Sequence, residues 1–120
     1  MKTENVVVEK SYSFALRIVK LYKYLIEQKK EFVLSKQIVR SGTSIGANVE
    51  EAVGGHSEKE FLSKIIISYK EARETHFWLR LMKDSEFLDE KLADSLINDV
   101  EELLRILGSI SLTMKEKLKQ

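Results

Sequence analysis

The apolar residues of this chain recur every three or four positions, which predicts four helices. Such spacing places apolar side chains on one face of an α-helix. It runs through residues 9–30, 35–53, 58–83 and 90–117. No stretch shows the strict alternation of apolar and polar residues that is typical of strands. The fold class that we predict is therefore all-α.

Each segment has a predicted core-facing stripe. The first comprises Ala15, Ile18, Tyr22 and Leu25, and it is widened by Phe14, Leu21 and Ile26. The second comprises Leu34, Ile38, Ile45, Val49 and Ala52. The third comprises Phe61, Ile65, Tyr69, Ala72, His76 and Leu79. The fourth has a heptad rhythm that comprises Leu96, Val100, Leu103, Leu107, Ile110 and Met114.

Residues that cap helices stand near the ends of these segments. Ser35 is the predicted N-cap of the second, because a serine side chain can accept a hydrogen bond from the first turn. Ser57 and Glu60 have the spacing of a capping box at the start of the third, in which each side chain accepts from the other residue's backbone N–H. Asp89 precedes the fourth, and the glycine pair at 54–55 ends the second.

The connections between the segments are short, so consecutive helices must run antiparallel. We predict a single domain over residues 1–120, folded as an antiparallel up-down-up-down four-helix bundle. Gly42 and Gly46 lie inside the second helix, where glycine costs up to about 1 kcal/mol relative to alanine. We expect close approach of a neighbouring helix to offset that cost.

The composition agrees with long helices and excludes several kinds of site. The 120 residues include no proline, although average usage would give about six, and proline breaks helix interiors. They include no cysteine and only two histidines, which excludes disulfides, thiolate metal sites and a histidine-rich metal site. We therefore expect no cofactor and no metal.

The sequence carries no motif of enzyme chemistry. A phosphate-binding glycine loop, a nucleophile elbow and inward-facing Glu-x-x-His pairs are all absent. His56 follows the glycine pair, and His76 lies on a core-facing line, where we expect a packed histidine with one hydrogen bond. No signal peptide or membrane span of roughly 18 apolar residues is present. We predict a non-enzymatic cytoplasmic protein without membrane contact.

The second and third helices each carry a further patterned face that a single bundle does not require. These two faces comprise Arg40, Ser44, Asn48 and Glu51, and Ile67, Glu71, Glu74 and Trp78. A tryptophan at helical spacing outside the core often anchors a partner, so one interpretation is a subunit interface. The other is a surface with scattered apolar residues.

The polar residues of these faces suggest pairing. Arg40 suits a carboxylate such as Glu71 or Glu74, either within the chain or across a subunit boundary. Asn48 both donates and accepts, so it suits a buried contact that sets helix register. The alternative is a solvated charged face that contributes little to the stability of the fold.

The net charge of +1 hides a strong segregation of charge. Residues 84–102 hold eight acids and one base, whereas residues 2–30 hold seven bases and three acids, and the tail from residue 105 is also basic. The two basic segments predict either a phosphate-binding surface or complementary packing against the acidic stretch. The candidate nucleic-acid-binding residues are Arg17, Lys20, Lys23, Lys29, Lys30, Lys115, Lys117 and Lys119.

Two stretches resemble a known family. Residues 44–52 (SIGANVEEA), preceded by LSKQIVR at 34–40, resemble the central motif of the four-helix-bundle proteins encoded in 23S rRNA intervening sequences. Phe61 and residues 70–79 (KEARETHFWL) resemble the pattern of that family's third helix. Many members have a proline in the first connection, and this chain has none at 28–32.

The resemblance implies a small antiparallel bundle that assembles into a ring of five subunits. A related branch of the family is the accessory variability determinant of diversity-generating retroelements, which acts together with a reverse transcriptase and nucleic acid. This resemblance implies a basic surface that contacts nucleic acid. We therefore expect a homo-oligomer, with five subunits favoured. Its partners would be RNA or a nucleic-acid-bound protein, or, in the alternative, it would be a protein-interaction scaffold that binds no nucleic acid.

Overall fold

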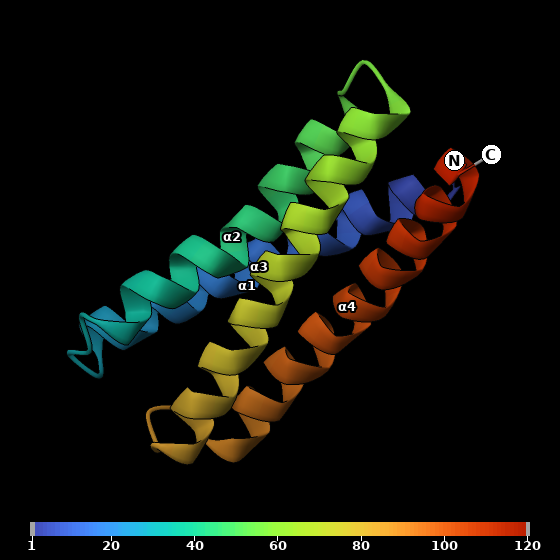
Figure 1. Cartoon of the computed structure of the whole chain (residues 1–120). Coiled ribbons are helices and arrows are strands. Elements are labelled where there is room, and N and C mark those ends of the chain that lie inside the picture. Colours follow the sequence, from blue (N-terminus) through green and yellow to red (C-terminus); the bar gives the residue numbers. More distant parts are fainter. Residues whose placement is uncertain (1, 120) are drawn as a thin grey trace.

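A computed structural model of the chain describes residues 2–119, with side chains from residue 5 onward. The side chains of Lys2 and Glu4, counted above in the basic N-terminal segment, lie outside this description. Four helices follow one another: α1 (Lys2–Glu27), α2 (Leu34–Val53), α3 (Glu58–Asp84) and α4 (Glu90–Lys119). They form the predicted antiparallel up-down-up-down bundle, which extends over 51 × 22 × 21 Å (Figure 1).

Each helix packs against two others. α1 contacts α2 and α4, and α3 also contacts α2 and α4, so the diagonal pairs stay apart. Figure 1 shows that the pairs α1/α2 and α3/α4 diverge toward the end that carries the α1–α2 and α3–α4 connections. No described helix is long and apolar enough to cross a membrane.

The first helix differs from the prediction in extent and in its core face. It begins at Lys2 rather than residue 9 and ends at Glu27 rather than residue 30. After the helix the chain turns at Lys30, which has a positive φ of 53°. The turn is thus made without a proline or glycine. The buried stripe is Val7, Ser11, Phe14, Ile18, Leu21 and Leu25. Ala15 and Tyr22 are predicted to face the core but are half-buried beside this stripe. The reason is that the sequence of α1 carries two neighbouring apolar stripes.

The start of α2 also corrects the prediction. Ser35 lies inside the helix, and Val33 is the N-cap residue without a side-chain cap. The Glu31 carboxylate instead accepts hydrogen bonds from the backbone N–H groups of Val33, Leu34 and Ser35, at 3.1, 3.0 and 2.7 Å. Desolvation opposes the charged form of Glu31, but these donors outweigh it, so its pKa lies below the ordinary value.

The remaining caps are closer to expectation. Ser57 Oγ accepts from the Glu60 N–H at 3.1 Å. The Glu60 carboxylate accepts from the His56 N–H at 2.7 Å rather than from Ser57, so the box is not reciprocal. Asp89 accepts from the Leu92 N–H at 2.8 Å, which confirms it as the cap of α4.

The glycines of α2 explain how α1 and α2 approach each other. A Cβ atom at Gly42 would lie 2.8 Å from Cγ1 and Cγ2 of Ile18, and one at Gly46 would lie 3.2 Å from the Ser11 carbonyl oxygen. Ile18 is fully buried. The predicted close approach of a neighbouring helix is confirmed, and that neighbour is α1.

We expect Gly42→Ala to destabilise the fold, although alanine favours helices, because the fully buried and β-branched Ile18 has no space to move. Overpacking of about 1–3 kcal/mol outweighs a gain of up to about 1 kcal/mol in helix propensity. Chemical denaturation would measure the free energy of unfolding.

Gly108→Ala is the matched control for this substitution. Its Cβ would meet Tyr69 at 3.4 Å, which is ordinary contact, so this variant should be as stable as the wild type or up to about 1 kcal/mol more stable. Equal stability of the two variants would contradict the packing argument.

Candidate functional site

A polar network joins α2 to α3 on the surface of the bundle. Arg40 on α2 donates to the Glu71 carboxylate at 3.2 Å and to the Glu74 carboxylate. The Trp78 indole N–H donates to the same Glu74 oxygen at 2.9 Å. The side chains of 71, 74 and 78 share one face of α3 because they are spaced three and four residues apart. The pairing predicted for Arg40 is therefore found within the chain.

Trp78 is more integrated into the chain than an exposed anchor would be. Its side chain is partly buried and packs against the core. Its ring also meets Phe77 edge to face, with centroids 5.1 Å apart. Because the chain itself satisfies the indole N–H, only part of this ring remains to contact a partner.

The hydrogen bonds of this network favour the charged forms of Glu74 and Arg40. The hydrogen bond from Trp78, followed by the hydrogen bond and charge of Arg40, holds the pKa of Glu74 below its ordinary value of 4.5. The hydrogen bond to Glu74 contributes most to raising the pKa of Arg40. Both groups are thus ionised at neutral pH.

The other predicted members of these faces lie nearby but do not join the network. Ser44 Oγ donates to the Ser41 carbonyl, and the Asn48 amide donates to the Ser44 carbonyl, each at 2.9 Å. Asn48 thus bonds within α2, and the described chain shows no register-setting contact between helices for it. Glu51 forms an ion pair with Lys64 at 2.9 Å. Ile67 stays exposed.

The basic residues predicted to bind nucleic acid divide into two groups. Arg17 pairs with Asp99 at 2.6 Å, so the acidic part of α4 does pack against basic residues of α1. Two residues of the tail also form ion pairs: Lys117 with Glu58 at 2.9 Å, and Lys119 with Glu116 at 3.7 Å. Exposed side chains with no ion pair among those described are Lys20, Lys23, Lys29, Lys30 and Lys115.

An apolar patch on α1 was missed by the sequence reasoning. Tyr12, Leu16 and Val19 are 63%, 52% and 38% exposed. Their spacing of four and three residues places them on one face, which we call the α1 patch. The signal was present as a second stripe beside the core stripe, but assigning Ala15 and Tyr22 to the core concealed it.

The histidines show no arrangement typical of catalysis or metal binding. His76 Nε2 lies 3.1 Å from a Glu101 oxygen, which is the single hydrogen bond expected of it, but the residue is only half-buried. Among the described residues, no three His, Asp or Glu side chains gather as metal ligands would.

The chain matches the sequence model of a known family. The sequence model described as 23S rRNA-intervening sequence protein matches residues 3–109. The chain belongs to this family. The matched residues cover α2 and α3 completely, including the motif at 44–52, where Ile45 and Val49 are buried.

A solved structure has the same fold. It is a protein of unknown function from the S23 ribosomal protein family of Bacteroides thetaiotaomicron VPI-5482. It is 49% identical, with a TM-score of 0.89 over 91% of this chain and 97% of that chain. No curated protein matches the chain. Neither the family nor this neighbour is an enzyme of known activity.

We expect Trp78→Phe to raise the pKa of Glu74 toward its ordinary value, because phenylalanine lacks the N–H that contributes most to lowering it. Carboxyl NMR titration would measure this pKa. A lowered folded-state pKa stabilises the fold above the unfolded-state value, and this contribution is lost as the pH falls through the folded-state pKa. The substitution should therefore reduce the acid dependence of stability.

Phe77→Leu is the control for this titration, because it removes the neighbouring ring and retains the indole N–H. The same Glu74 pKa in both variants would show that the hydrogen bond does not set it.

Proposed function

We propose that this member of the 23S rRNA-intervening sequence protein family is a non-enzymatic subunit that assembles with copies of itself into a closed ring. The observation that carries the proposal is that one subunit exposes two different apolar patches. The number of five subunits comes from the family resemblance.

The second patch, which we call the α3 patch, continues the stripe that contains Trp78. Ile67 and Leu81 are exposed, and the partly buried Trp78 lies between them along the helix. Positions 67, 71, 74, 78 and 81 step by four and three residues, so they share one face of α3. Glu71 and Glu74, which bind Arg40, lie between Ile67 and Trp78 on the same face, so the α3 patch combines apolar residues with an internal polar network.

The two patches suit head-to-tail assembly. A two-fold dimer uses one patch that contacts its own copy, whereas a ring joins two different patches of neighbouring subunits. The α1 patch and the α3 patch lie on helices that do not contact each other in the described chain, and α2 contacts both helices. Each subunit therefore has an apolar face for each of two neighbours.

We expect Leu16→Glu and Ile67→Glu each to abolish the ring, since a charge in either patch opposes desolvation of the contact. Light scattering at micromolar concentration should give a multiple of 13.9 kDa for the wild type. Each variant should fall to a subunit mass of 13.9 kDa. Circular dichroism would check that both remain helical.

Mixing the two variants tests the head-to-tail contact directly. Each retains the patch that the other has lost, so an equal mixture should form a dimer and nothing larger. Leu112→Glu, an exposed position outside both patches, is the matched control and should assemble like the wild type. A wild-type mass of 13.9 kDa would contradict the proposal.

A second candidate function is nucleic-acid binding by the assembled protein. The observation that favours it is that four exposed bases of α3 and α4 have no acidic partner among the described side chains: Lys70, Arg73, Arg105 and Lys115. The α1 surface named by the sequence is less suited, because Arg17 is paired with Asp99. A scaffold that binds only protein would show no salt-dependent affinity for nucleic acid.

A further inference from the structure

A groove of about 360 Å³ runs between α3 and α4 on the outside of the bundle. Tyr69 and Lys70 contribute to its α3 side, and Gly108, Leu112 and Lys115 to its α4 side. No acidic residue lines it. The volume is at the lower end of the range for small-molecule sites, so the groove suits a single planar ring better than a folded peptide.

The Tyr69 ring lines this groove and packs against the core. Tyr69 is half-buried, and its Cε2 atom lies where a Cβ on Gly108 would make van der Waals contact, at 3.4 Å. The ring therefore lies close to the backbone of α4 at position 108, with space left for a methyl group. A half-buried tyrosine ring at the wall of a groove offers a surface on which a nucleobase can stack.

Four exposed bases accompany the groove. Lys70 and Lys115 stand on its opposite walls. Tyr69 lies beside Gly108, and His76 contacts Glu101, so the residues between these two contacts lie side by side on α3 and α4. Arg73 and Arg105 both lie in this interval, and they extend the row of bases. We call these four bases together with Tyr69 the α3/α4 strip. None of the four forms an ion pair with a described side chain.

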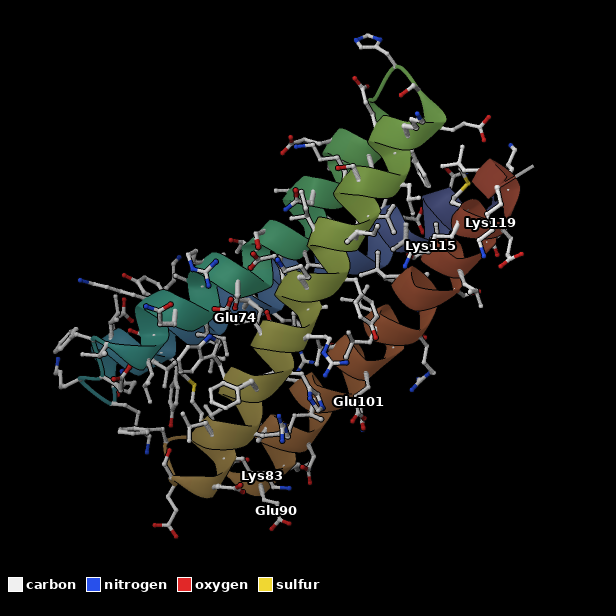
Figure 2. All side chains as sticks on the ribbon, in the orientation of Figure 1. Glu74, Lys83, Glu90, Glu101, Lys115 and Lys119 are labelled. Carbon is white, nitrogen blue, oxygen red and sulfur yellow. The ribbon has the colours of Figure 1, made fainter. Side chains whose placement is uncertain are left out.

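The nearby acids are already engaged elsewhere. Glu71 and Glu74 pair with Arg40 on the α2 side of α3. Glu101 contacts His76, and Glu116 pairs with Lys119. Figure 2 shows the same separation along α4, with Lys115 and Lys119 on its last turns and Glu90 at its opposite end. No described carboxylate therefore lies within ion-pair distance of the four bases, although Glu101 lies one turn from Arg105 along α4.

The groove between α1 and α4 is the competing surface. Arg17, Lys20 and Tyr24 line it. Arg17 is paired with Asp99, and residues 90–102 of α4 hold five acids and one base. Residues 105–119, the part of α4 that includes the wall of the α3/α4 groove, hold four bases and one acid. A polyanion is therefore attracted more strongly to the α3/α4 strip.

We propose that the α3/α4 strip binds a single-stranded nucleic acid, with Lys70, Arg73, Arg105 and Lys115 contacting phosphates and one base stacking on Tyr69. Proteins that bind single strands combine a row of cations with an aromatic platform in this way. The proposal rests on the second candidate function above and assigns its binding surface.

Fluorescence anisotropy with labelled single strands of about 16 nucleotides tests the strip. RNA and DNA of the same sequence are measured separately, so that the experiment shows which of the two nucleic acids the protein binds. The wild type should bind at least one of the two, and its affinity should fall between about 50 mM and about 200 mM salt. Lys70→Glu combined with Lys115→Glu should weaken binding at least about tenfold, through lost and repelled phosphate contacts.

Lys20→Glu combined with Lys23→Glu is the matched control, because it changes the net charge equally on α1 and should weaken binding less than about threefold. Tyr69→Leu should weaken binding about tenfold through lost stacking without changing the dependence on salt. The milder pair Lys70→Gln and Lys115→Gln retains the test if the glutamate variant misfolds.

The outcomes separate the strip from the function on which it rests. A wild type that binds neither RNA nor DNA would overturn nucleic-acid binding and the strip together. A wild type that binds, with both double variants weakened equally or the α1 variant weakened more, would overturn the strip alone. A change in assembly mass for the Lys70 and Lys115 variant would identify the strip as a subunit contact and overturn the proposal.

Discussion

The contact of Ile18 with Gly42 is the constraint on which the arrangement of the other faces depends. It brings α1 so close to α2 that a single added methyl group would overlap the Ile18 side chain. That approach fixes the rotation of α1, because Ile18 must face inward together with Phe14 and Leu25. The second apolar stripe of α1, which contains Leu16, is consequently turned outward. A buried packing contact thus creates the exposed α1 patch.

Charge is distributed around the bundle by a similar division between helix faces. Arg40 draws the acids of α3 toward α2, and the acids in the first half of α4 meet the bases of α1, as the Arg17–Asp99 pair shows. Lys70 and Arg73 of α3 and Arg105 and Lys115 of α4 form no ion pair with a described side chain. A chain with a net charge of +1 can therefore present a local basic surface. Exposed pairs of this kind contribute little to stability, so their main effect is on the surface potential.

The sequence predicted the fold more fully than the surfaces. The apolar spacing located all four helices, and the end of α2 at Val53 and the cap of α4 at Asp89 were correct. The start of α2 was predicted within one residue, but its cap was wrong because Glu31, four residues before Ser35, supplies the capping carboxylate. The core stripe of α1 was correct at Ile18 and Leu25 but wrong at Ala15 and Tyr22, because two apolar stripes lie side by side in its sequence. Local patterns do not indicate which of two such stripes a neighbouring helix will cover.

The sequence by itself determined the helices, their order, the close approach at Gly42 and the suitability of Arg40 for Glu71 and Glu74. These features follow from periodicity, from the cost of glycine in a helix and from charge complementarity, all of which are local or pairwise. Only the tertiary structure decided that this pairing lies within the chain, that Leu16 is exposed and that Tyr69 lies in a groove between lysines. The reason is that exposure and the neighbours of a charge depend on the rotation of each helix against the others, which the packing of all four helices sets together.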